Sequence, residues 1–337
     1  MRLIKNWPSR RTHSRSGTLL WALILCPLLP LQPLMAAGLP NQNNGFDLSA
    51  STIPVNEIMY GGPPRDGIPA LTDPAFTPVK DAVYLNDDDR VIGVDRNGEQ
   101  KAYPIAILNY HEIVNDAIGG ERIAVTYCPL CGTGIVYEAL VTGQQLEFGV
   151  SGLLYNSDVL LYDRQTESLW SQVLSRAISG PMTNQRLTLI PARHTSWKAW
   201  REQHPNTRVL SQDTGHRRDY KRSPYGDYDR SPGVYFPVAN SDPRYHTKEI
   251  VLTLDHNGMT RAWPFSELAR YQQLSGNSLL QDTFGATPLT IEFNLDARSA
   301  RILDVNNREI PSVQAFWFAW IAFHPNTEVY QAPTGTD

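Results

Sequence analysis

Residues 91–98 are Val91-Ile92-Gly93-Val94-Asp95-Arg96-Asn97-Gly98, and the chain continues to Lys101-Ala102-Tyr103-Pro104. A later stretch matches them at a constant offset: Val251-Leu252-Thr253-Leu254-Asp255-His256-Asn257-Gly258, then Arg261-Ala262-Trp263-Pro264. Apolar strand-forming residues on both sides of an Asn-Gly pair predict a strand, a tight turn and a returning strand. Each hairpin leads into an amphipathic stretch, so we expect helices over 105–114 and 265–274.

A second pair of matching segments follows the hairpins. Trp197-Lys198-Ala199-Trp200 leads to His204-Pro205, and Trp317-Phe318-Ala319-Trp320 leads to His324-Pro325. Both indicate a helix that ends before a His-Pro turn. The predicted fold is therefore α+β, with two pseudo-repeated β-rich units carrying short helices. The predicted organisation is an irregular N-terminal arm (38–79), a first unit (80–212), a Tyr/Arg-rich connecting loop (213–239) and a shorter, degenerate second unit (240–337).

The first 37 residues predict a signal peptide. Basic residues at the start precede an apolar run over 18–34 and the small residues Ala36-Ala37-Gly38. We therefore expect a periplasmic or otherwise extracytoplasmic protein. Ser9-Arg10-Arg11 leaves both the general and the twin-arginine export routes open. No later apolar stretch is long enough to span a membrane.

Composition limits the partners of the mature chain. The net charge is −4 and no basic run follows the signal, which argues against nucleic-acid binding. Eight Trp and 15 Tyr supply large amphipathic side chains that suit a β-rich core or a binding cleft. A small molecule, a metal ion or a thiol is the partner that this composition permits.

The cysteines give the sharpest functional signal. The chain has three, and Cys26 lies within the predicted signal, which leaves Cys128 and Cys131 in Tyr127-Cys128-Pro129-Leu130-Cys131-Gly132. The following glycines and β-branched residues predict a tight turn into another strand, unlike the strand-to-helix setting of thioredoxin-like sites. Cys-Pro-x-Cys-Gly is also typical of a metal-binding turn that directs both sulfurs at one cation.

His111 is the candidate partner of the cysteine pair. With Cys128 and Cys131 it would leave one coordination position open on a zinc or copper(I) ion, and Glu112 or Asp116 would support the ligands. In a redox couple Cys128 would attack, Cys131 would resolve and His111 would tune the thiolate. A cysteine nucleophile with a histidine base is a further reading. The alternative is a non-catalytic binding protein with a structural disulfide and a Tyr/Trp-rich recognition cleft.

A second dense segment lies downstream of the cysteines. Asp163 and Arg164 are further catalytic candidates, and the predicted substrate cleft contains Ser151, Ser168, Trp170 and Gln172. The structural alternative is that Asp163 and Thr166 form an Asx-type turn.

Five motifs together resemble a bacterial and archaeal family known as DUF3179. They are residues 111–116 (HEIVND), 126–131 (TYCPLC), 148–152 (FGVSG), 163–172 (DRQTESLWSQ) and 224–228 (PYGDY). The resemblance covers most of the mature chain and implies a protein that is often exported. It implies no particular activity, so the function has to be argued from the site.

Overall fold

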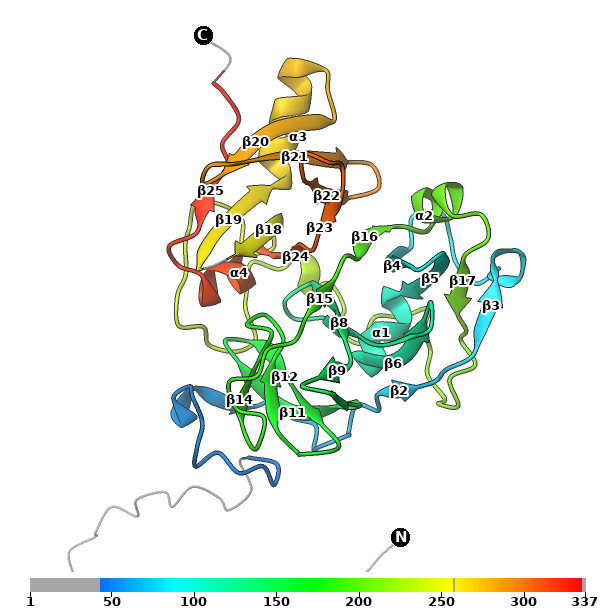
Figure 1. The fold of residues 1–337 in the computed structure, drawn as a ribbon, viewed down its shortest axis with the longest axis vertical. Helices are drawn as coiled ribbons and strands as arrows, with labels where there is room; N and C mark the ends of the chain where they lie inside the picture. Colours follow the sequence, from blue (N-terminus) through cyan, green and yellow to red (C-terminus); the bar gives the residue numbers. More distant parts are fainter. Residues whose placement is uncertain (1–42, 257, 335–337) are drawn as a thin grey trace, which may run out of the picture. The chain divides into compact units, whose positions relative to one another are not determined.

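The computed structural model describes residues 43–256 and 258–334 (Figure 1). These residues form 25 strands and only four α-helices, so the α+β prediction is wrong and the fold is mainly β. The helices are α1 (Ile105–His111), α2 (Trp197–Gln203), α3 (Phe265–Ser275) and α4 (Trp317–Phe323). Helix α1 ends three residues before its predicted end, because Glu112 has a φ of 56° and Ile113 begins a strand. The predicted signal peptide lies outside the described residues.

The largest sheet has nine strands. Eight follow one another in the order β2 (Leu71–Thr72), β6 (Ile113–Ile118), β7 (Glu121–Cys128), β8 (Thr133–Glu138), β24 (Val313–Phe316), β18 (Ile250–His256), β19 (Met259–Pro264) and β25 (Glu328–Val329), while β15 (Leu189–Ile190) also pairs with β8. The sheet joins strands from both predicted units through the pairing of β8 with β24, where Gly134 lies opposite Gln314. The two predicted units therefore share the main sheet and do not form separate β-rich units.

The first predicted hairpin forms in a separate five-stranded sheet. Its order is β16 (Arg193–Ser196), β4 (Arg90–Arg96), β5 (Glu99–Pro104), β17 (Arg208–Leu210) and β3 (Phe76–Pro78). Asn97 and Gly98, with φ values of 51° and 81°, form the two-residue turn that the Asn-Gly pair predicts. The second hairpin pairs Val251 with Pro264 and His256 with Met259, while Asn257 in its turn is outside the described residues.

The remaining strands form three smaller sheets. One contains β1 (Ile58–Tyr60), β11 (Phe148–Tyr155), β12 (Asp158–Asp163), β13 (Leu169–Ser171) and β14 (Arg176–Ser179). A second contains β20 (Leu279–Phe284), β21 (Thr287–Asn294), β22 (Ser299–Leu303) and β23 (Glu309–Ile310), and a third pairs β9 (Leu140–Val141) with β10 (Gln144–Gln145).

Tryptophans fill the core. Trp170, Trp197, Trp200, Trp317 and Trp320 are each at most 2% exposed, and burying such large side chains contributes most of the apolar area per residue. The helices predicted before the two His-Pro turns are present as α2 and α4. No helix of the described chain is long and apolar enough to cross a membrane.

The segment between β17 and β18 covers one side of this core. The structure gives it only the short 3-10 helix Tyr228–Arg230 as regular structure. Tyr225, Phe236 and Tyr245 nevertheless pack against the largest apolar cluster, which also contains Cys128 and Cys131. This cover places aromatic side chains from the connecting loop beside the cysteine turn.

Candidate functional site

The cysteine pair lies in a tight turn between two central strands. Strand β7 ends at Cys128 and β8 begins at Thr133, which confirms the predicted turn into another strand. The Cys131 N–H donates to the Cys128 carbonyl at 3.2 Å, which closes the turn. Gly132 follows with a φ of 59°, and a Cβ there would lie 2.8 Å from the Phe316 ring. Glycine is therefore required both by the backbone conformation and by the packing.

A two-residue hairpin turn brings a carboxylate to the thiols. Strands β11 and β12 are joined by Asn156 and Ser157, whose φ values of 51° and 66° define a primed turn. The Asn156 amide donates to the Ala322 carbonyl at 3.2 Å, and its oxygen accepts from the Ala239 N–H at 2.8 Å. These bonds fix the turn, so that Asp158 begins β12 directly beside the cysteines.

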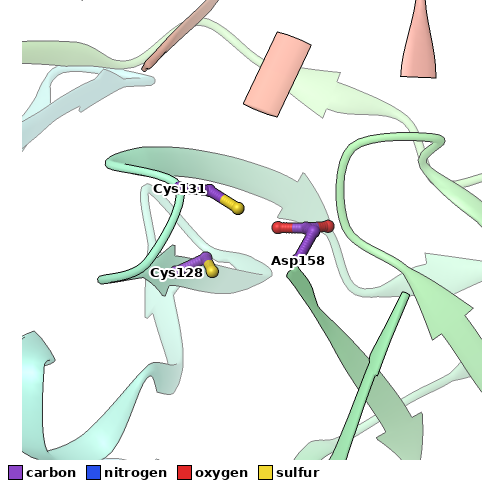
Figure 2. Close-up of side chains that lie close together, drawn as sticks. All are labelled: Cys128, Cys131 and Asp158. Atoms are coloured by element: carbon purple, nitrogen blue, oxygen red, sulfur yellow. The ribbon is translucent and has the colours of Figure 1, made fainter. Parts of the chain in front are cut away.

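Cys128, Cys131 and Asp158 form one compact cluster. One ligand atom from each lies within 4.8 Å of the others, and Figure 2 shows the sulfurs and the carboxylate directed into the same space. Both cysteines are free thiols, and all three side chains are at most 1% exposed. The Cys131 sulfur donates to the Ser157 carbonyl at 3.3 Å. Asp158 accepts from the Val173 N–H at 3.1 Å, while its Oδ1 has no partner among the described residues.

Burial dominates the electrostatics of the cluster. It raises the pKa of Asp158 to about 7, raises that of the Cys128 thiol, and raises that of the Cys131 thiol well above its usual range. Among the described residues, no Lys, Arg or His forms an ion pair with Asp158. Each group alone is costly to ionise here, because its negative charge would be buried without compensation. A cation placed between them would reverse that balance.

Glu112 adds a fourth buried acid next to the cluster. Its backbone carbonyl accepts from the Tyr127 N–H at 2.7 Å, which ties the end of α1 to the strand that carries Cys128. Among the described residues its carboxyl accepts only from the Tyr225 hydroxyl, at 3.4 Å, and burial raises its pKa to about 8. Glu112 and Cys128 line the same cavity.

This thiol cavity has a volume of about 370 Å³ and mainly apolar walls. The connecting loop supplies Pro224, Tyr225 and Phe236 to one wall, and β11 and β12 supply Val150 and Val159 to another. Cys128 is the member of the cluster that lines it. The cavity therefore borders the cluster at Cys128.

His111 is not part of the cluster. Its Nδ1 lies 2.7 Å from the Pro69 carbonyl oxygen, and its Nε2 lies 2.7 Å from the Tyr220 hydroxyl, which also bonds Thr214 at 2.6 Å. Burial lowers the pKa of His111 to about 4, so the ring is neutral at ordinary pH. Both nitrogens are thus engaged, and the residue links the N-terminal arm to the connecting loop.

Asp163 and Thr166 form the Asx-type turn that was the alternative to a catalytic role for Asp163. Its carboxylate accepts from the Thr166 N–H at 2.6 Å, from the Thr166 hydroxyl at 2.8 Å and from the Trp170 indole at 2.9 Å. Thr166 in turn bonds Ser168 at 2.7 Å. These contacts give Asp163, Ser168 and Trp170 a common role in shaping the turn after β12.

The other candidates are also separate from the thiols. Arg164 pairs with Glu147 at 3.0 Å and with Asp66 at 3.3 Å, and its side chain is 37% exposed. The Ser151 hydroxyl accepts from the Leu153 N–H at 3.0 Å, within the irregularity of β11. None of Ser151, Ser168, Trp170 and Gln172 is among the residues that line the thiol cavity.

Gln172 supports the cysteine turn from outside the cluster. Its amide donates to the Thr126 hydroxyl at 2.8 Å and to the Thr133 carbonyl at 3.3 Å, so it joins the two strands that flank the turn. Asp158 is the member that sequence reasoning missed. Its only sequence signal is its place directly after Asn156-Ser157, a pair that tolerates a primed turn.

Fold and site together define a class: a mainly β protein with two buried thiols and a buried carboxylate beside an apolar cavity. A family model described as "Protein of unknown function (DUF3179)" matches residues 65–307, and the chain belongs to this family. No curated protein and no solved structure matches the chain. The family expected from the sequence motifs is thereby confirmed, and the function has to be argued from the cluster.

Proposed function

We propose that the protein binds one zinc ion through Cys128, Cys131 and Asp158. The observation that carries the proposal is the grouping of three buried acidic ligands whose carboxylate forms no ion pair with a Lys, Arg or His among the described residues. Buried charges in proteins are paired or coordinate metals, and thiolate and carboxylate are both ligands of zinc. The unpartnered Oδ1 of Asp158 supplies a free lone pair for that role.

The spacing suits zinc after a small contraction. Tetrahedral zinc with Zn–S bonds of about 2.3 Å and Zn–O bonds of about 2.1 Å places its ligand atoms about 3.5–3.8 Å apart. The cluster holds these atoms within 4.8 Å of one another, so side-chain movements of about 1 Å or less would bring them to the zinc spacing. A carboxylate oxygen favours zinc over copper(I), which prefers sulfur ligands alone.

Three protein ligands leave one position open. Structural zinc sites are closed by four ligands, whereas catalytic and transfer sites keep one position for water or substrate. Because Cys128 lines the apolar cavity, the open position is reached from there. The proposed metal site would therefore accept a small molecule. We propose that it does so outside the cytoplasm, where the predicted signal peptide would direct the protein. Bound metal would also protect the thiols in an oxidising compartment.

Thiol–disulfide exchange is less well supported. The attacking group in that chemistry is an exposed thiolate of lowered pKa. Here burial raises the pKa of both thiols, and both side chains are inaccessible to a protein partner. The surroundings therefore favour thiols that ionise only when a metal binds.

The test is metal analysis of the native protein combined with thiol titration. We expect one equivalent of zinc and thiols that react only after chelation. Cys131→Ser and Asp158→Asn should each weaken zinc binding at least about tenfold. His111→Asn is the control: it keeps a donor for the Pro69 carbonyl and should retain the zinc. Metal-free protein with two reactive thiols, or loss of zinc in the His111 variant alone, contradicts the proposal.

A further inference from the structure

A second cavity also borders the cysteine turn. It has a volume of about 360 Å³, and Gly132 lies on its wall. Pro129 and Tyr225 line both this space and the thiol cavity. We call it the cationic cavity, because four basic side chains and one acid, Asp229, line it. The basic side chains are Arg90, Arg230, Lys248 and Arg298, of which Arg230 and Arg298 are exposed, as is Asp229.

Lys248 is the most deeply buried of these cations. The residue is 5% exposed, and its ammonium donates to the Gly233 carbonyl at 2.7 Å. It lies 4.0 Å from the centre of the Tyr228 ring and 4.6 Å from that of Phe318. No carboxylate forms an ion pair with it among the described residues. Aromatic rings and one carbonyl only partly replace the hydration of an ammonium ion.

Arg90 shows the same imbalance. Its guanidinium donates to the carbonyls of Ala297 and Arg298, the latter at 2.9 Å. Within the described chain it forms no ion pair, and its five N–H groups exceed these two contacts. Two poorly compensated cations therefore line one cavity.

The same cavity wall carries two polar atoms without partners. The Tyr228 hydroxyl and the Gln314 side-chain oxygen find no hydrogen bond within the described residues. Tyr228 is 3% exposed and Gln314 is 7% exposed. Buried polar groups are nearly always satisfied, and leaving one unsatisfied costs about 1–3 kcal/mol. A donor and an acceptor are thus both available to a ligand.

We infer that the cationic cavity binds a small organic anion that also carries a hydroxyl or amine. The anion would accept from Tyr228 and offset the charges of Arg90 and Lys248. The donor of the ligand would reach Gln314, and an apolar body would pack between the rings of Tyr127 and Phe316, which also line the cavity. This site is distinct from the proposed zinc cluster, although the two share the cysteine turn.

The test uses 4-hydroxybenzoate as the probe, with 4-hydroxybenzyl alcohol as its neutral counterpart and inorganic phosphate as a bare anion. Isothermal titration of the full-length protein should show saturable binding of the benzoate and much weaker binding of the alcohol. Binding of phosphate as tight as that of the benzoate would contradict the organic part of the inference. Absence of binding by both anions at millimolar concentration would overturn it entirely.

Two variants locate the binding. Lys248→Met should lower the affinity for the benzoate about tenfold or more, whereas the exposed control Lys198→Met should leave it unchanged. Tyr228→Phe should lower it roughly threefold to tenfold. Unchanged affinity in both cavity variants overturns the inference.

The melting temperature of the unliganded protein distinguishes a binding role of the Tyr228 hydroxyl from a role in folding. Removing an unsatisfied hydroxyl should leave the melting temperature of Tyr228→Phe unchanged or raise it, whereas a purely structural hydroxyl would lower it. Zinc content should stay unchanged in this variant. If the wild-type protein contains no zinc but still binds 4-hydroxybenzoate, the result contradicts only the metal proposal.

Discussion

Replacing Glu112 by Gln should remove a large part of the pH dependence of stability. Glu112 is 7% exposed, and its carboxyl accepts from the Tyr225 hydroxyl at 3.4 Å and from no other group in the described part of the chain. Burial raises its pKa from the ordinary 4.5 to about 8. The folded protein therefore keeps a proton that the unfolded chain has already released at neutral pH.

The sign follows from proton linkage. Where the folded state binds more protons than the unfolded state, stability falls as pH rises. The contribution of Glu112 is complete below pH 4.5 and is lost as pH rises through about 8. At about 1.4 kcal/mol per pKa unit, the full loss is about 5 kcal/mol. This is an upper value, since Asp158 titrates in the same region and the two acids repel each other.

The assay is urea unfolding followed by tryptophan fluorescence in the presence of a chelator. At pH 5 the wild type and Glu112→Gln should differ by less than about 1 kcal/mol. At pH 8.5 the variant should be more stable by about 3–5 kcal/mol, because an amide has no charge to bury. Asp158 is present in both proteins, so its contribution largely cancels in the difference.

Glu202→Gln is the matched control, because Glu202 is exposed and the substitution is chemically identical. It should reproduce the wild-type pH profile. Zinc should flatten the profile of the wild type, since a cation beside Glu112 favours its ionised form. Equal pH slopes for wild type and Glu112→Gln in chelator would refute the reasoning and show that the carboxyl is already hydrated or paired.

Three further substitutions test local contacts. Gly132→Ala should cost about 2 kcal/mol or more in urea unfolding, because φ is 59° and the new Cβ would lie 2.8 Å from the Phe316 ring. Tyr220→Phe removes the 2.7 Å bond to His111 and should cost about 1–2 kcal/mol, with faster limited proteolysis within 213–239. Asp163→Ala should cost about 3 kcal/mol through its lost turn bonds, while zinc content of the folded fraction, measured by metal analysis, stays unchanged.

Local patterns account for the parts of the fold that the sequence predicts. The Asn-Gly pair at 97–98 specifies its hairpin because both residues tolerate positive φ, and the observed register pairs Arg96 with Glu99 around it. The turn at Cys128 is equally local, since Pro129 and Gly132 restrict it. The sequence patterns overstate the share of helix, because three of the four helices have only seven residues and short strands make up most of the regular structure.

Long-range pairing accounts for the parts that the sequence does not predict. The main sheet depends on the pairing of β8 with β24, where Gly134 lies opposite Gln314, and no periodicity within either segment specifies that pairing. Proximity in sequence favours a partnership of His111 with the cysteines, but the positive φ of Glu112 ends its helix and the His111 ring bonds Pro69 and Tyr220 instead. Asp158 arrives from a separate sheet, and only tertiary packing places it beside the thiols.

The cysteine turn is the element through which the two proposed sites would influence each other. Pro129 and Tyr225 line both cavities, so a ligand in either one contacts the same wall. Zinc held by Cys128 and Cys131 would fix that wall and reduce the ordering that an anion must impose, which favours anion binding. Linkage is reciprocal, so the anion would strengthen zinc binding by the same factor. Equal anion affinities with and without zinc would mean that the wall is already rigid in the metal-free protein.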